Sequence, residues 1–207
     1  MPLEQIMARV RRALLLDVSV FEDVRDDAPF TPFAIGVAAA TALLGGIGAF
    51  LWSWIILDET KDFFLEATIL GTVFLLLLWL AGMIFTYFIL SQTYRENVTM
   101  DGLVRVMSLG SVPFALSLFV FIPGIRFGIA LISVATMFFY TNYGVRAAYP
   151  AIDPMRVFIA TLGGFAVWAL ILPLLTSSDN QFAPGPFVFE WSEDVAEKLS
   201  DAYSALR

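Results

Sequence analysis

The chain has 207 residues, of which 59% are hydrophobic and 15% charged, and its mean hydropathy is +0.80. Soluble globular domains average about 45–50% apolar and about 25% charged residues, so this composition indicates a membrane protein. The formal net charge of −7 leaves no basic face for a nucleic acid partner. Histidine and cysteine are absent, which excludes disulfides, thiolate metal sites and histidine-ligated haem. We therefore expect no catalytic residue, no cofactor and no metal.

We expect residues 1–31 to form a cytoplasmic segment of amphipathic helices. Apolar side chains recur at helical spacing over residues 3–16, which predicts a helix in the headgroup plane or packed on the membrane-spanning helices. Ser19 and Glu22 match a capping box and predict a second short helix. Docking of a soluble partner is the alternative role for both helices. The apolar stripe of the first helix consists of Leu3, Met7, Val10 and Leu14.

Residues 32–178 contain enough apolar sequence for five transmembrane helices. The hydrocarbon core of a bilayer is about 30 Å thick, so a helix needs about 20 apolar residues to cross it. The interval 106–143 is too long for one span and suitable for two. We therefore expect an all-α, polytopic membrane protein. The expected spans are 32–57, 67–94, roughly 104–121, roughly 125–146, and 157–178.

The sequence FIPGIRFG, residues 121–128, interrupts that long interval. Proline lacks the backbone N–H that a helix interior needs, and the pair Pro123 and Gly124 is typical of a turn. Because backbone groups in lipid must satisfy one another, we expect a tight third–fourth helical hairpin, with Arg126 reaching the headgroups from its turn. The alternative is one long helix kinked at Pro123, which would hold Arg126 near the bilayer centre at about 2.5–3.5 kcal/mol or more.

Two of the expected spans carry small residues at positions that let helix backbones approach closely. In the first span they occur in GVAAATALLGGIGA, and in the fifth span a pair of glycines could face them. We expect these residues to pack helices within the bundle, with a seam between two copies of the chain as the alternative. They are Gly36, Ala40, Ala42, Gly46, Gly163 and Gly164.

Lysine and arginine are distributed unequally between the two sides of the expected spans. One side, formed by the N-terminal segment and the second–third and fourth–fifth connections, holds Arg9, Arg11, Arg12, Arg25, Arg95, Arg105, Arg146 and Arg156. Cytoplasmic segments carry an excess of these residues, so we expect the N-terminus inside and, after five spans, the C-terminus outside. No formally charged residue lies in the middle of a span, which argues against a pump or a proton-coupled carrier.

Residues 179–207 form an acidic tail that we expect on the external side. Phe187, Phe189 and Trp191 alternate at period two, and the residues after them predict an amphipathic helix whose apolar stripe includes Leu199. A helix this short is marginal in water, so it needs a surface to lie on. We expect these four side chains to contact a partner protein, with an interfacial aromatic belt as the alternative.

Four stretches of the chain carry a resemblance to a known family. They are RALLLDVSVFEDVRDD (12–27), DGLVRVMSLGSVPFAL (101–116), IPGIRFGIALI (122–132) and YGVRAAYPAIDPMRVFIATLGG (143–164). Together they resemble the prokaryotic branch of the Yip domain family, which is named for proteins that interact with Ypt/Rab GTPases. The resemblance implies a five-span, non-enzymatic membrane protein linked to trafficking and membrane shaping. The acidic-aromatic N-terminal motif of eukaryotic members has no counterpart here, so we do not expect a small GTPase as partner.

The function expected from these observations is that of a non-catalytic integral membrane scaffold or accessory subunit in the cytoplasmic membrane of a prokaryote, with a role in membrane organisation. Its expected partners are membrane lipids and other membrane protein subunits. The alternative is a permease or lipid transporter for a neutral or amphipathic substrate. A polar cavity at midplane depth would favour the transporter, whereas a dry bundle with an exposed apolar side face would favour the scaffold.

Overall fold

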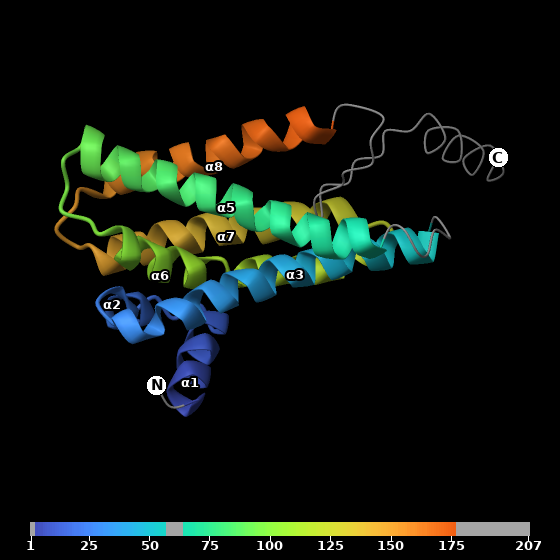
Figure 1. Ribbon diagram of the computed structural model, residues 1–207, viewed down its shortest axis with the longest axis horizontal. Helices are drawn as coiled ribbons and strands as arrows, with labels where there is room; N and C mark the ends of the chain where they lie inside the picture. The colour runs from blue at the N-terminus through green and yellow to red at the C-terminus, as the bar shows by residue number, and fades with distance from the viewer. Residues whose placement is uncertain (1–2, 57–63, 177–207) are drawn as a thin grey trace.

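The computed structural model describes residues 3–56 and 64–176, and these residues form helices without any strand. The elements in chain order are α1 (Leu3–Leu14), α2 (Val20–Arg25), η1 (Ala28–Phe30), α3 (Thr31–Ile56), η2 (Leu65–Leu70), α5 (Gly71–Phe88), η3 (Ile89–Thr93), α6 (Met100–Gly110), η4 (Val112–Phe121), α7 (Arg126–Ala148) and α8 (Pro154–Thr176). The long helices run along one common axis, and α1 projects sideways near the end of the bundle that carries α2 (Figure 1).

Four helical stretches within the described residues are long and apolar enough to cross a membrane. They are Ala28–Trp52, Thr68–Thr93, Met100–Phe121 and Arg126–Ala148. These stretches confirm that the first four apolar windows of the sequence form helices of spanning length. The fifth expected span corresponds to α8, a helix of 23 residues, Pro154–Thr176, of which the part Pro154–Val167 is described with its side chains and is apolar.

Several helices begin at signals that the local sequence supplies. Thr99 precedes α6, and its hydroxyl oxygen accepts a hydrogen bond from the backbone N–H of Gly102 at 3.2 Å. Asp153 precedes α8, and its carboxylate accepts from the backbone N–H groups of Met155 at 2.7 Å and Arg156 at 3.3 Å. Both side chains satisfy N–H groups that the first turn of a helix leaves without partners, which fixes where the helices begin.

The structure confirms the expected turn between the third and fourth spans. η4 ends at Phe121, α7 begins at Arg126, and Gly124 between them has a φ of +82°, which favours glycine. The guanidinium of Arg126 is half-buried and lies 4.3 Å from the centre of the Trp52 ring at the end of the first spanning stretch. Arg126 therefore contacts an aromatic face in addition to any headgroup contact.

The glycines Gly163 and Gly164 pack on a different helix from the one expected. A Cβ built on Gly163 would lie 2.7 Å from Ile89, and one built on Gly164 would overlap the backbone of Gly82. Gly82 belongs to α5 and Ile89 to η3, which continues α5 directly, so neither neighbour belongs to α3. Helix α3 instead packs on η4, where a Cβ on Gly48 would lie 2.8 Å from the carbonyl oxygen of Leu118. The fifth-span pair therefore faces α5 and not the small residues of α3.

The other small residues of α3 divide between two faces. Ala42 and Gly46 are buried within the bundle, as expected. Gly36 and Ala40 are exposed, and a Cβ on Gly36 would meet no atom within 4 Å. Within the described chain, therefore, Gly36 and Ala40 do not pack helices together, because they lie on the outer face of α3.

The outer surface of the bundle is strongly apolar. Leu77 on α5 is 58% exposed, and on α7 Ile132 is 58% and Phe139 is 55% exposed. Soluble monomers rarely expose contiguous apolar patches larger than a few hundred Å², so a surface of this kind belongs in hydrocarbon or against another protein. The buried interior is apolar as well, with its largest cluster around Phe21, Phe30 and Leu103 at the α2 end.

Candidate functional site

Four arginines dominate the polar contacts at the end of the bundle where the N-terminal helices pack. We call them the arginine clamp; they are Arg9, Arg12, Arg25 and Arg105. Four of the five ion pairs in the described chain involve members of this clamp. The sequence alone placed all four on the predicted cytoplasmic side. It did not indicate that their side chains bind the N-terminal segment and the ends of neighbouring helices.

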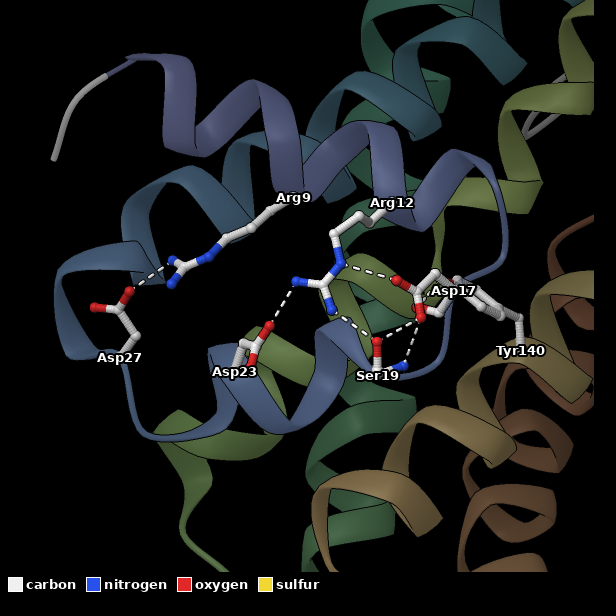
Figure 2. A network of polar contacts seen from close by, with 7 residues as sticks. All are labelled: Arg9, Arg12, Asp17, Ser19, Asp23, Asp27 and Tyr140. Carbon is white, nitrogen blue, oxygen red and sulfur yellow. Dashed lines mark hydrogen bonds and ion pairs between the residues drawn. The ribbon is translucent and has the colours of Figure 1, made fainter.

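Arg12 is the centre of the network drawn in Figure 2. Its guanidinium donates to Asp17 at 2.8 Å, to Asp23 at 2.5 Å and to the hydroxyl oxygen of Ser19 at 2.7 Å. Ser19 in turn donates to Asp17 through its hydroxyl at 2.6 Å and through its backbone N–H at 2.9 Å. The hydrogen bonds from Ser19 and the charge of Arg12 lower the pKa of Asp17 to about 2.

The capping box expected at Ser19 is not formed. The short helix α2 does begin directly after Ser19, but the Ser19 side chain makes no capping hydrogen bond to it. The reason is local competition, because the carboxylate of Asp17 lies two residues earlier and takes both the hydroxyl and the backbone N–H of Ser19. The pattern therefore predicted the start of the helix correctly and its stabilising contact wrongly.

Arg9 fixes the other half of α1 to the chain that follows. It donates to Asp27 at 2.6 Å (Figure 2). Its guanidinium also lies 4.9 Å from the centre of the Phe30 ring. The apolar stripe of α1 points away from these contacts, since Leu3 is 72%, Met7 60% and Leu14 61% exposed. One face of α1 is thus fixed by charge, and a neighbouring apolar face is left open.

The loop that carries Asp17 is also tied to the fourth spanning helix. Tyr140 on α7 donates its hydroxyl to the backbone oxygen of Asp17 at 3.4 Å (Figure 2). The ring of Phe21 packs edge-on against Tyr140 with ring centres 5.0 Å apart. A Cβ on Gly144 would lie 2.7 Å from the Phe21 ring, so the absence of a side chain at Gly144 makes room for it. Together these contacts bury Phe21 fully against α7.

Arg105 is buried and binds helix ends. It is only 5% exposed and donates through Nε to the backbone oxygen of Arg25 at 3.0 Å and through Nη1 to Thr31 at 2.8 Å. Arg25 is the last residue of α2, whose C-terminal carbonyl groups have no partner within the helix. A cation is favourable at that end of a helix, and these acceptors offset part of the cost of burying the guanidinium.

Arg25 repeats the same arrangement on the next helix. Its Nη1 donates to the backbone oxygen of Ala148, the last residue of α7, and its Nη2 donates to Asp26 at 2.5 Å. The guanidinium of Arg25 also lies 5.7 Å from the centre of the Tyr149 ring, and burial raises the pKa of the Tyr149 phenol. The clamp therefore connects α6 to α2 through Arg105, and α2 to α7 through Arg25.

Among the described residues of the spanning bundle there are two small cavities of about 30 Å³ each, and Trp79 and Met137 line both of them. A cavity needs about 10–15 Å³ to hold one water molecule, so each has room for about two. Polar atoms reach them through Thr141 in one and through Thr41 and Ser111 in the other. Neither cavity could hold a metabolite or a lipid. In the described part of the chain no three His, Cys, Asp or Glu side chains gather as metal ligands would.

The structure distributes the residues that the sequence singled out over three places. The turn residues Pro123, Gly124 and Arg126 lie together at the end of the bundle remote from the clamp, and the packing residues lie along α3 and α8. The expected partner-contact residues Phe187, Phe189, Trp191 and Leu199 lie outside the described residues. The clamp was missed as a site because its contacts join residues up to 123 positions apart.

No family model, no curated protein and no solved structure matches this chain.

Proposed function

We propose that this chain is a non-catalytic integral membrane protein that acts as a scaffold or accessory subunit of a larger complex. In this proposal α8 is the fifth span, and the protein resides in the cytoplasmic membrane of a prokaryote. The five-span layout and the four stretches that resemble the Yip domain family support the assignment. The observation that carries it is the pairing of a filled interior with an apolar outer face. Helices with that surface can bind lipid or other helices, and the two cavities between them in the described chain are too small for a substrate.

The proposed topology follows from which segments share an end of the bundle. The clamp joins α2 to α6 and α7, and Arg156 at the start of α8 pairs with Glu96 in the connection before α6 at 2.6 Å. The N-terminal segment, the connection before α6 and the connection before α8 therefore lie at the same end of the bundle. This agrees with the proposed topology, in which the chain crosses the membrane twice between one of these segments and the next. Because this side holds most of the lysine and arginine, we propose that it is cytoplasmic.

In this orientation α1 lies in the headgroup layer of the inner leaflet. Its open apolar face, with Leu3, Met7 and Leu14, supplies the contact with the acyl boundary. Attraction to anionic lipid is left mainly to the exposed Arg11, because Arg9 and Arg12 are already paired with aspartates. We thus propose that α1 binds the membrane through its apolar face. The clamp fixes α1 to the bundle, so that a shift of α1 moves the helices to which it is bound.

The test is site-specific photocrosslinking in native membranes. A photoreactive benzoylphenylalanine replaces Phe88 on α5, which is 55% exposed, or Phe139 on α7; the matched control replaces Phe114, which is 5% exposed. A scaffold should crosslink a second membrane protein from at least one exposed site and none from Phe114. Crosslinks confined to lipid at both exposed positions, together with substrate flux in reconstituted vesicles, would instead support the transporter.

The acidic tail is proposed as a second contact for partners, on the external side. Its aromatic residues Phe187, Phe189 and Trp191, with Leu199, have the composition of an interface centre. Truncation after Asn180 should release a partner that co-purifies with the full chain while the bundle stays in the membrane. A truncated protein that keeps every partner would remove the tail from the proposal and leave the helical surface as the contact.

A further inference from the structure

An open groove of about 470 Å³ lies between the end of α7 and the start of α8, at the end of α7 that Arg25 of the clamp binds. Its volume falls in the range of small-ligand sites. None of its lining residues belongs to the arginine clamp. They are Asn142, Arg146, Asp153, Pro154, Met155 and Phe158.

The groove contains one cation and one anion that do not neutralise each other. Arg146 is exposed and lies 5.6 Å from the centre of the Tyr143 ring. Asp153 is exposed and uses one carboxylate oxygen, Oδ1, to accept the first N–H groups of α8. Within the described chain no ion pair or hydrogen bond joins Arg146 to Asp153. The groove therefore offers opposite charges to a ligand at two separate points.

Neighbouring charges do not change this balance. Arg156, two residues into α8 from the groove edge, is held by Glu96 at 2.6 Å and lies over the ring of Tyr94. Its charge is therefore directed toward the α5–α6 connection. The local net charge of the groove is zero, which disfavours a ligand that carries a net charge of either sign.

Below the two charges the wall of the groove becomes apolar. Met155 is 64% and Phe158 is 37% exposed, and the exposed residues Ile159 and Leu162 continue the same character along α8. The amide of Asn142 closes the inner wall, where it donates to Thr161 at 2.8 Å. A polar entrance at the end of the bundle that leads to an apolar track along a helix matches a molecule with a zwitterionic head and an acyl chain.

We propose that this groove binds the headgroup of a phospholipid with a primary ammonium, of the phosphatidylethanolamine class. The phosphate pairs with the guanidinium of Arg146, the ammonium donates to the carboxylate of Asp153, and one acyl chain follows Phe158 along α8. The carboxylate repels a headgroup with net negative charge, and a quaternary choline has no N–H to donate to it. The inference rests on the membrane placement proposed above, but not on the scaffold role.

The test measures which lipid the purified full-length chain retains. Protein in detergent is mixed with equal amounts of 1-palmitoyl-2-oleoyl phosphatidylethanolamine, phosphatidylcholine and phosphatidylglycerol, and retained lipid is counted by native mass spectrometry. The wild type should retain one phosphatidylethanolamine with about tenfold preference, which corresponds to about 1.4 kcal/mol. Equal retention of the three lipids, or a preference for phosphatidylglycerol, would overturn the proposal.

Two variants separate the two charges. Asp153→Asn keeps an oxygen that can cap α8, since asparagine ranks with aspartate at that position, but it removes the charge. It should abolish the preference for phosphatidylethanolamine and raise retention of phosphatidylglycerol. Arg146→Gln should lower retention of all three lipids about tenfold. Arg95→Gln, which removes an exposed cation at the same end outside the groove, is the control and should change nothing; an equal loss there would show general charge attraction and refute the site.

Because the lipid is measured on the isolated chain, this result is independent of any protein partner. Loss of the lipid preference would leave the photocrosslinking test of the scaffold unaffected. Conversely, a chain that binds phosphatidylethanolamine but crosslinks no protein would keep the groove and remove the scaffold role.

Discussion

Replacing Gly164 with alanine should destabilise the bundle by about 1–2 kcal/mol. At this position α8 crosses α5, and an added Cβ would overlap the carbonyl oxygen of Gly82 and the hydroxyl of Thr86. The approach is close in reverse as well, since a Cβ on Gly82 would lie 2.8 Å from the oxygen of Gly164. Overpacking costs about 1–3 kcal/mol, and a backbone oxygen cannot rotate away, so the upper half of that range applies. The helix preference of alanine over glycine offsets up to about 1 kcal/mol.

Thermal unfolding in detergent measures this loss, followed by tryptophan fluorescence because Trp79 lies beside the crossing. At about 2–4 °C per kcal/mol, the midpoint should fall by about 2–8 °C. Gly36→Ala is the matched control, since nothing lies within 4 Å of its Cβ, and its midpoint should stay or rise slightly. Adding Thr86→Ala to Gly164→Ala should rescue little, because the backbone overlap remains. If Gly164→Ala melts at or above the midpoint of Gly36→Ala, the described contact between α5 and α8 is wrong.

Three further outcomes are expected. Arg126→Leu should lower stability by only about 0.5–1 kcal/mol, the worth of a half-exposed contact with the Trp52 ring. A loss above about 3 kcal/mol in the same melting assay would mean that Arg126 is a buried charge on whose partners the bundle depends, which contradicts its place at the turn. Because the pKa of Asp17 is lowered from 3.8 to about 2, its carboxylate should stabilise the docked N-terminal segment fully above about pH 4 and lose that effect as the pH falls toward 2. A nitroxide spin label on α1 should become more mobile as the pH falls from about 4 to about 2, and this change should be smaller in Asp17→Asn. Identical titrations of the wild type and the variant would contradict the role of the Asp17 carboxylate in docking the segment. In intact cells an impermeant thiol reagent should label a cysteine at Ile125 but not one at Asn97, and the opposite pattern would invert the topology.

Composition and hydropathy were sufficient to predict the helical class and four helices of spanning length. Length and apolarity decide whether a helix can cross a bilayer, and both are properties of a continuous segment. The turn at Pro123 and Gly124 was predictable for the same reason, since its signal lies within four consecutive residues. Such features depend on the chain next to them and hardly on the rest of the fold.

The clamp and the glycine contacts could not be predicted in this way. Arg105 looked like a loop cation, because nothing nearby in the sequence shows that a helix end 80 residues earlier supplies its acceptor. The pair Gly163 and Gly164 indicated close packing of helices. Small residues fit any neighbouring backbone, however, so whether they face α5 or α3 depends on how the whole bundle is assembled. At Ser19 two local signals competed, and the carboxylate of Asp17 prevailed over the capping box.

The span of the clamp has a consequence for how the protein is made. Arg25 leaves the ribosome long before its acceptor at Ala148, which follows 123 residues later. At about 5–20 residues per second, roughly 6 to 25 s pass between the synthesis of the two. During that interval the N-terminal helices can reach α6 at most, because the α7 half of their docking site is not yet made, and Phe21 has no ring of Tyr140 to cover it. The clamp can therefore close only after the fourth span has been made. A nascent chain that is stalled before Ala148 should still expose its N-terminal segment to protease.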